Sequence, residues 1–179
     1  MGRADVAPPT LLFVIGASGA GKTAAVHALA ARGLPGVRCY HFDTIGVPSP
    51  EIMQRDWGGG ERWQEDATRR WIERLVANQD GAQCAVLDGQ TRPSFIQRWI
   101  AGADAGHVRI VLLDCTTAVR AARLAGPRGQ PELATQQMDT WAVYLRGQAD
   151  ALQLPVLDTT DLSVDEVAAA LARELDTLL

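Results

Sequence analysis

The residues best suited to chemistry form one short segment near the start of the chain, Gly16-Ala17-Ser18-Gly19-Ala20-Gly21-Lys22-Thr23. Its spacing is Gly-x4-Gly-Lys-Thr, in which glycines let the backbone curl so that successive N–H groups point inward at phosphate oxygens. In such a loop Lys22 reaches the β- and γ-phosphates, and the hydroxyl of Thr23 is a ligand of Mg²⁺. We therefore predict that residues 16–23 bind ATP and Mg²⁺ and that Lys22 also takes part in catalysis.

Lys22 is also the only lysine of the chain, because the other sixteen of its 17 basic residues are arginines. The plain alternative is a glycine-rich turn with an accidental lysine, and it has to explain why the lysine lies at this position. Arg is not equivalent there, since a compact ammonium on a flexible stem can follow a moving phosphate. The composition therefore favours a phosphate-binding loop.

Carboxylates follow three of the apolar runs further along the chain, at Asp43, Asp88 and Asp114. In a doubly wound sheet the carboxyl ends of the strands face the crevice where ligands bind. A magnesium-triphosphate site usually needs a carboxylate at the tip of a neighbouring strand, so we predict that Asp88 binds Mg²⁺ together with Thr23. A strand-end turn or a helix cap is the alternative for each Asp, and it is strongest for Asp114.

The elements that must position these residues are visible as strand-length apolar runs that alternate with amphipathic segments of helical length. This pattern predicts an α/β fold with a doubly wound parallel sheet of five strands, helices on both faces and a single domain. We place strands at residues 11–15, 37–42, 84–87, 109–113 and 155–157. We place helices at 21–32, 61–78, 93–101, 118–125, 131–152 and 163–179, and mobile loops at 56–60 and 126–130.

The composition removes several classes of function. A net charge of −4 argues against a nucleic-acid-binding protein, which usually carries a basic stripe. No apolar run approaches the roughly 18 residues that span a bilayer, and residues 1–10 lack the features of a signal peptide. Cys39, Cys84 and Cys115 are widely separated and lie in or beside apolar runs, which predicts buried thiols. We expect a cytoplasmic monomer or homodimer without membrane partners.

These residues resemble the small P-loop kinase group, which includes adenylate kinase, shikimate kinase and gluconate kinase. The likeness covers nearly the whole chain in element order, although only the phosphate loop is highly specific. The segment Leu87-Asp88-Gly89-Gln90-Thr91-Arg92 resembles the Leu-Asp-Gly-Phe-Pro-Arg segment of adenylate kinases. The resemblance implies the strand order 2-3-1-4-5, a magnesium-organising role for Asp88, and a catalytic role for Arg92 in holding the acceptor.

An arginine-rich stretch after the fourth strand resembles the lid of the same group. Arg120, Arg123 and Arg128 lie within nine residues that contain no acidic side chain. The resemblance implies a lid at about 120–131, in which Arg123 and Arg128 neutralise charge during transfer and Arg120 contacts the nucleotide. For Arg120 and Arg123, exposed positions on an ordinary helix are the alternative.

The departures from this group concern the acceptor, which the resemblance places against residues 44–63. Adenylate kinases carry an Arg shortly after the Asp of the second strand, as part of a clamp on the acceptor phosphate, and residues 43–48 contain none. In kinases that act on a hydroxyl, a carboxylate at this place accepts or orients the acceptor proton, which makes Asp43 the candidate base. His41 is either a second acceptor contact or a packed histidine. Trp57 is the better candidate for stacking on the acceptor, and Trp63, in helical register with Trp71, for the core.

The sequence thus predicts an enzyme that moves the γ-phosphoryl group of ATP to a small-molecule hydroxyl, such as that of a nucleoside, a sugar-like metabolite or an antibiotic. One alternative is a nucleoside monophosphate kinase, in which Arg55, Arg92 and Arg98 build an unfamiliar phosphate pocket. The other is a nucleotide-dependent regulatory ATPase without a small-molecule acceptor.

Overall fold

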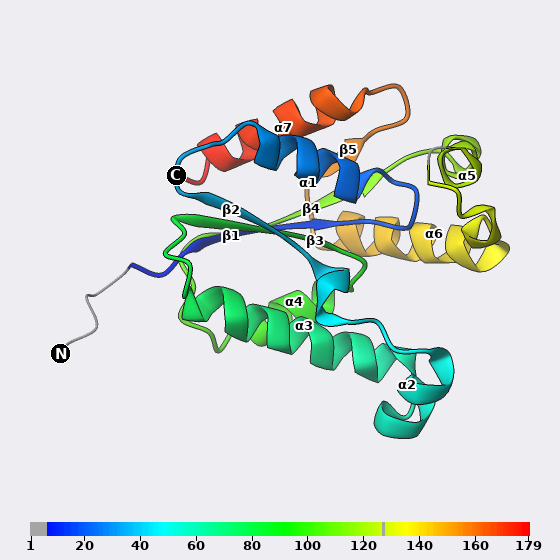
Figure 1. Ribbon diagram of the computed structural model, residues 1–179, viewed down its shortest axis with the longest axis horizontal. Helices are drawn as coiled ribbons and strands as arrows, with labels where there is room; N and C mark the ends of the chain where they lie inside the picture. The colour runs from blue at the N-terminus through cyan, green and yellow to red at the C-terminus, as the bar shows by residue number, and fades with distance from the viewer. Residues whose placement is uncertain (1–6, 127) are drawn as a thin grey trace.

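A parallel sheet with the strand order β2-β3-β1-β4-β5 organises the computed structural model, which describes residues 7–126 and 128–179 (Figure 1). Its strands are β1 (Thr10–Ile15), β2 (Val37–His41), β3 (Cys84–Gly89), β4 (Val108–Asp114) and β5 (Val156–Asp158). Every residue of β1 and β3 is buried, as expected for strands covered on both faces. The predicted doubly wound sheet and its strand order are confirmed.

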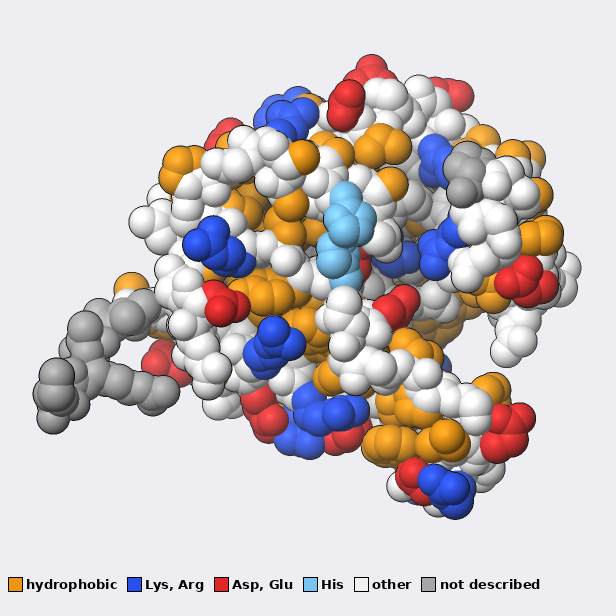
Figure 2. Space-filling model, in the orientation of Figure 1, with side chains coloured by type: hydrophobic (Ala, Val, Ile, Leu, Met, Phe, Trp, Pro, Cys, Tyr) orange, Lys and Arg blue, Asp and Glu red, His pale blue; other side chains and the backbone are white. Residues whose placement is uncertain are grey.

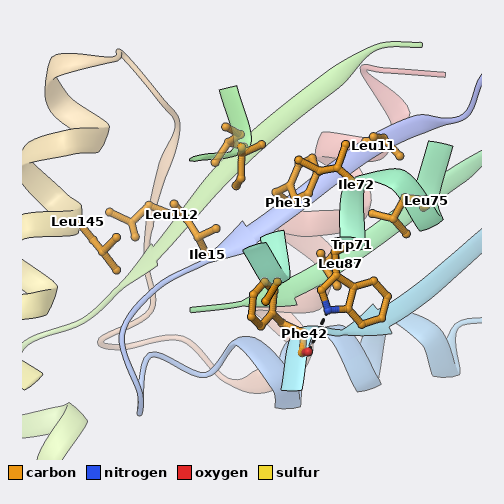
Figure 3. Packing of buried hydrophobic residues seen from close by; sticks show 14 of the residues in the cluster. Leu11, Phe13, Ile15, Phe42, Trp71, Ile72, Leu75, Leu87, Leu112 and Leu145 are labelled. Atoms are coloured by element: carbon orange, nitrogen blue, oxygen red, sulfur yellow. Dashed lines mark hydrogen bonds between the residues drawn. The ribbon is translucent and has the colours of Figure 1, made fainter. Parts of the chain in front are cut away.

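Helices cover both faces of the sheet (Figure 1). One face carries α1 (Lys22–Ala31) and α7 (Val164–Asp176), and the other carries α3 (Gly60–Ala77), α4 (Pro93–Ile100) and α6 (Gln136–Ala151). Alternate residues of β1 divide between the two cores, with Phe13 on the α3 side and Leu12 on the α1 side. In the α3 core the Trp71 indole nitrogen donates to the Phe42 carbonyl at 3.0 Å, which ties α3 to the end of β2 (Figure 3).

The carboxyl ends of the strands meet at one edge of the sheet, and the segments that directly follow the strands lie along this edge. The short helix η1 (Phe42–Ile45) follows β2, and α5 (Thr117–Ala125) follows β4. Residue pairing in the sheet aligns Val14 of β1 and His41 of β2 with Asp88 of β3. The phosphate loop, which follows β1, therefore lies beside Asp88, as the parallel topology requires.

The predicted mobile loop at 56–60 is wrong, because these residues form a tight connection between two helices. Asp56 and Trp57 end α2 (Pro50–Trp57), a helix that the sequence analysis missed, and Gly60 begins α3. Gly58 caps α2 in the left-handed region at φ 77°, which glycine adopts without strain. At eight residues α2 spans only about two turns, which is too short for a helical apolar repeat to be recognised in the sequence.

The helix predicted at 131–152 is interrupted near its start. Pro131 begins the short helix η2 (Pro131–Leu133), and α6 begins only at Gln136. Thr135 is the N-cap of α6, since its hydroxyl accepts from the Met138 amide at 3.2 Å. In the predicted loop 126–130, Pro127 lies outside the described residues, and the Gln130 amide donates to the Leu124 carbonyl at 2.8 Å.

Two further expectations from the sequence concerned membrane-spanning segments and the cysteine thiols. Within residues 7–126 and 128–179, no helix has the length and apolarity needed to cross a bilayer, and residues 1–6 lie outside this description. The three cysteines are free; Cys84 and Cys115 are buried, whereas Cys39 is half-buried. Burial raises the pKa of Cys84 to about 12 and that of Cys39 to about 11, so both are thiols at neutral pH.

Candidate active site

The phosphate loop joins the buried end of β1 to the start of α1. Its Gly21 is the N-cap of α1 at φ 93°, and no side chain caps this end of the helix. The first amides of α1 therefore have no side-chain acceptor, and the positive end of the helix dipole points into the loop. This arrangement suits an anion such as a nucleotide phosphate.

Two glycines of the loop have no room for a side chain. A Cβ at Gly16 would lie 2.5 Å from the Leu113 carbonyl oxygen, and one at Gly19 would lie 2.8 Å from the Cγ of Arg120. Gly19 also has φ +83°, which other residues adopt only with strain. The loop is thus held against β4 and α5 at positions that only glycine can fill.

Lys22 is buried at the start of α1, and its ammonium donates to the Ala17 carbonyl at 2.9 Å. Burial lowers the pKa of Lys22 to about 8, an effect that nearby Asp88 and Asp43 oppose and Arg128 reinforces. Three predicted site residues from three other segments, Asp43, Asp88 and Arg128, therefore act on this one ammonium group. A desolvated cation in this position gains from the arrival of a polyphosphate.

Asp88 is buried at the end of β3, and its carboxylate lies 2.9 Å from the Nδ1 of His41. The His41 ring also lies against His27 of α1, with ring centroids 4.2 Å apart. His41 is thus a neighbour of the predicted metal ligand and not a simple core residue. Its contact with Asp88 holds the carboxylate beside the end of β1, where the phosphate loop begins.

The donor set present fits Mg²⁺ better than a metal held by protein ligands alone. Among the described residues, no three His, Cys, Asp or Glu side chains are grouped so that they could hold a metal ion. Mg²⁺ commonly keeps several waters and binds through one or two protein oxygens together with substrate phosphates. Thr23, which lines the loop cavity, and the buried carboxylate of Asp88 match that requirement.

A cavity of about 790 Å³ adjoins the loop and has the size of a small-molecule site. Its walls come from the loop, the first turns of α1, the end of α5 and the segment that follows β5. The predicted residues that line it are Gly19, Ala20, Gly21, Lys22, Thr23, Arg123 and Arg128, whereas Gly16, Ala17 and Ser18 lie buried behind them. Thr159, Leu162 and Val164, from β5 to the start of α7, also line this cavity.

The three arginines of the predicted lid are placed differently. Arg123 donates to the Thr159 carbonyl at 2.6 Å and to its hydroxyl at 2.9 Å, and it lines the loop cavity. Arg128 is exposed at the cavity rim, where it donates to the side chain of Gln130. Both arginines therefore lie on the phosphate-loop side of the site.

Arg120 is buried behind the loop instead of lining the cavity. It donates to Asp139 of α6 at 2.8 Å and to the Cys115 carbonyl at 3.0 Å, and it lies 3.5 Å from Asp114 of β4. This placement does not support the predicted nucleotide contact. It gives Arg120 a positioning role, because the side chain packs directly under Gly19. Asp114 is occupied by this ion pair as well.

A second cavity, of about 710 Å³, lies between α3, the segment after β3, and the η2–α6 region. The surface is hollowed between α2 and the part of the molecule formed by α5 and α6 (Figure 2). Arg92 lines this cavity, as do Gln64, Gln90, Trp141 and Tyr144, which the sequence analysis missed. The last two lie one turn apart on α6, a spacing that does not by itself distinguish a cavity wall from a core contact.

Trp63 belongs to the α3 core, as predicted, whereas Trp57, the predicted stacking residue, does not line the second cavity. Trp63 lines the second cavity, although it is largely buried. Trp57 packs against the α3 core, and its indole donates to Asp66 at 3.3 Å. Trp57 therefore packs against α3, because the short α2–α3 connection brings the end of α2 close to that helix.

Asp43, the candidate base, is exposed in η1, directly after β2. It lies at the carboxyl end of the sheet, and its negative charge favours the charged form of Lys22. Arg55 pairs with Asp56 at 2.6 Å, and Arg98 pairs with Glu65. Neither arginine lines the second cavity, so the phosphate pocket considered for a monophosphate acceptor is not assembled.

Neither a protein-family model nor a curated protein sequence matches the chain. Solved structures do match it. A sugar kinase from Janibacter sp. has a TM-score of 0.66 and 20% identity, over 94% of this chain and 95% of that chain. A gluconokinase from Sinorhizobium meliloti has a TM-score of 0.64 and 22% identity, over 96% of each chain. For a shikimate kinase from Acinetobacter baumannii in complex with shikimate the values are 0.63 and 16%, over 95% of this chain and 94% of that chain. The chain therefore has the fold of the small P-loop kinases.

Proposed function

We propose that the protein is an ATP- and Mg²⁺-dependent phosphotransferase that moves the γ-phosphoryl group to a hydroxyl of a small-molecule acceptor. The observation that carries this proposal is the presence of one cavity lined by the phosphate loop and a second cavity whose lining residue Gln90 contacts that loop. A direct hydrogen bond links the two sides, from the Ser18 hydroxyl to the Gln90 side chain at 3.1 Å. The solved kinases that share the fold support the same class of reaction.

Each side chain has a defined task in this proposal. The loop amides and Lys22 hold the triphosphate, while Thr23 and Asp88 hold Mg²⁺, which neutralises phosphate charge when bound. Phosphoryl transfer requires mainly positioning and charge neutralisation, for which Arg123 and Arg128 lie on the nucleotide side. Asp43 accepts or orients the acceptor proton, and Arg92 shapes the acceptor side.

A hydroxyl acceptor is favoured over a nucleoside monophosphate by the pairing of the nearby arginines. Arg55 and Arg98 are engaged by Asp56 and Glu65, outside the cavity. A regulatory ATPase is disfavoured because it would have no use for a second cavity of this size beside the loop.

ADP release with and without acceptors tests the proposal. Purified protein is incubated with ATP·Mg²⁺ and a panel of nucleosides, sugars, sugar acids and aminoglycosides. We expect ADP release that depends on an acceptor and that falls about 10²- to 10³-fold in Lys22→Met, which removes the ammonium at nearly the same volume. ATP hydrolysis that is indifferent to every acceptor, or a fully active Lys22→Met, would contradict the proposal.

A further inference from the structure

Among the described residues, the charges that line the second cavity leave no unpaired cation for an anionic acceptor. Its lining includes one cation, Arg92, and two carboxylates, Glu61 and Glu132. Arg92 already donates to the Gln64 side chain at 2.6 Å and to Glu61 at 3.3 Å. Its guanidinium also lies over the Trp141 ring, 5.0 Å from the ring centroid. An anion placed here would lose its hydration and meet a cation that is already compensated.

The arginines near the cavity are directed elsewhere. Arg55 and Arg98 form ion pairs outside it, and Arg62 packs near Gly58 at the α2–α3 connection. Arg128 lines the nucleotide cavity, where its charge acts on Lys22. The lining of the acceptor side is therefore negative overall.

The same lining is well suited to a flat and hydroxylated molecule. Trp141 and Tyr144 stack at an interplanar angle of 17° with centroids 5.3 Å apart, and Met138 and Leu133 extend this apolar wall. The polar side chains that line the same cavity are Gln64, Gln90, Gln137, Thr135 and Thr140. The Gln64 amide is already engaged by Arg92 and by the Gln90 carbonyl, which leaves the other amides and hydroxyls for a ligand. Such groups pair with hydroxyls without requiring a charge.

Two donors in this wall lack a partner. The indole nitrogens of Trp63 and Trp141 are buried and have no hydrogen-bond acceptor among the described residues. Buried donors are nearly always paired in folded proteins, and leaving one unpaired is unfavourable. A small rotation of either ring in the presence of a ligand oxygen would satisfy it.

We propose that the acceptor is an uncharged hydroxyl compound with a flat apolar part, of the aryl glycoside or nucleoside type, and that this cavity discriminates against carboxylates and phosphates. This inference rests on the proposed kinase function, because it assigns the acceptor of that reaction. The flat part lies against Trp141 and Tyr144, and the hydroxyls face the amides of Gln90 and Gln137. Specificity arises because the cavity lacks a compensating cation, so it rejects anions.

Pairs of compounds that differ at one functional group, neutral in one member and anionic in the other, test the inference. The probes are para-nitrophenyl β-glucoside against para-nitrophenyl β-glucuronide, and uridine against its 5′-monophosphate. Each is titrated into protein saturated with Mg²⁺ and a non-hydrolysable ATP analogue, while the tryptophan indole N–H signals are followed by NMR. Trp63→Phe and Trp141→Phe identify the two signals of interest.

We expect the uncharged member of each pair to shift the Trp63 and Trp141 signals and to bind at least about tenfold more tightly than its anionic partner. Equal or tighter binding of the anionic members would overturn the inference, and so would the absence of any shift with both uncharged members. This readout does not require turnover. Binding of the uncharged probes without their phosphorylation by ATP would therefore count against the proposed function, whereas preferred phosphorylation of anions would count against this inference alone.

Glu61→Gln provides the second test, because it leaves the charge of Arg92 uncompensated while the side chain keeps its size. We expect the preference for glucoside over glucuronide to fall several-fold in this variant. Glu65→Gln is the matched control, since Glu65 lies one turn further along α3 and pairs with Arg98 outside the cavity. An unchanged preference in Glu61→Gln, or an equal loss in Glu65→Gln, would overturn the role of cavity charge.

Discussion

Because Lys22 is buried, we expect both the stability of the fold and the affinity for ATP to change with pH above about 8. Burial lowers its pKa from 10.5 to about 8, so the nucleotide-free folded protein loses this proton more readily than the unfolded chain. The unfolded chain then binds more protons between these two pH values, and the free energy of unfolding rises with pH across that window. ATP needs the charged form, so its affinity falls as the pH rises above about 8.

Urea unfolding and ATP titrations, each at pH values below and within this window, check both expectations. The two pH effects have opposite directions, and both disappear in Lys22→Met. A nucleotide-free protein that loses stability over this window, or ATP affinity that is the same at each pH, would show that Lys22 is not a buried cation of this kind.

Asp43 is expected to affect the chemical step and not nucleotide binding. Positioned general bases contribute about 10²- to 10⁴-fold, so Asp43→Asn should lower kcat by that factor and leave the KM for ATP nearly unchanged. Steady-state kinetics with any acceptor that supports turnover provide the measurement. Asp176→Asn, at the C-terminal end of α7, is the control. Unchanged turnover in Asp43→Asn would remove Asp43 from the acceptor site.

At the scale of elements, the phosphate loop depends on its contact with α5. In Gly19→Ala a methyl group has to fit 2.8 Å from the Arg120 side chain at φ +83°, so α5 or the loop must shift. We expect a loss of about 3 kcal/mol in the free energy of unfolding together with weaker ATP binding. Gly33→Ala has a similar φ of +62° and nothing within 4 Å, so it should lose only about 1 kcal/mol. Equal losses in the two variants would show that the close approach of α5 is unimportant.

Arg120 joins α5 to α6 and β4 through its buried ion pairs. Arg120→Met leaves the carboxylates of Asp139 and Asp114 without this partner and should reduce the free energy of unfolding by about 3 kcal/mol. Arg146→Met removes a more exposed pairing with Asp114 and Asp150 and should lower it by less than about 1 kcal/mol. Chemical denaturation measures both. Weaker ATP binding in Arg120→Met at unchanged stability would instead restore the nucleotide contact predicted from the sequence.

For the whole molecule, the parallel sheet could be predicted because strand-length apolar runs alternate with helical segments, whereas the strand order came from the resemblance to small P-loop kinases. The phosphate loop could be predicted because backbone geometry restricts its residue types, as the positive φ of Gly19 and Gly21 illustrates. The position of Asp88 beside the phosphate loop could be predicted because Asp88 lies at the end of a strand. These features are local in sequence, or follow from the topology of a parallel sheet.

The features that could not be predicted depend on contacts between distant segments. The absence of acidic residues around Arg120 indicated a free cation, but its partners Asp114 and Asp139 come from β4 and α6. Trp141 and Tyr144 form a cavity wall only because η2 and α6 fold toward α3. The break before α6 was missed because the Pro131 start signal and the Thr135 cap lie within one turn of each other.

The fate of the γ-phosphoryl group tests the central claim most directly. Protein and ATP·Mg²⁺ labelled in the γ-phosphoryl group are incubated with small molecules from a cell extract, and the products are separated and analysed by mass spectrometry, with Lys22→Met in parallel. The proposed function predicts label on an organic product as a phosphate ester of a hydroxyl, formed by the native protein and not by the variant. Label found only in inorganic phosphate would contradict it.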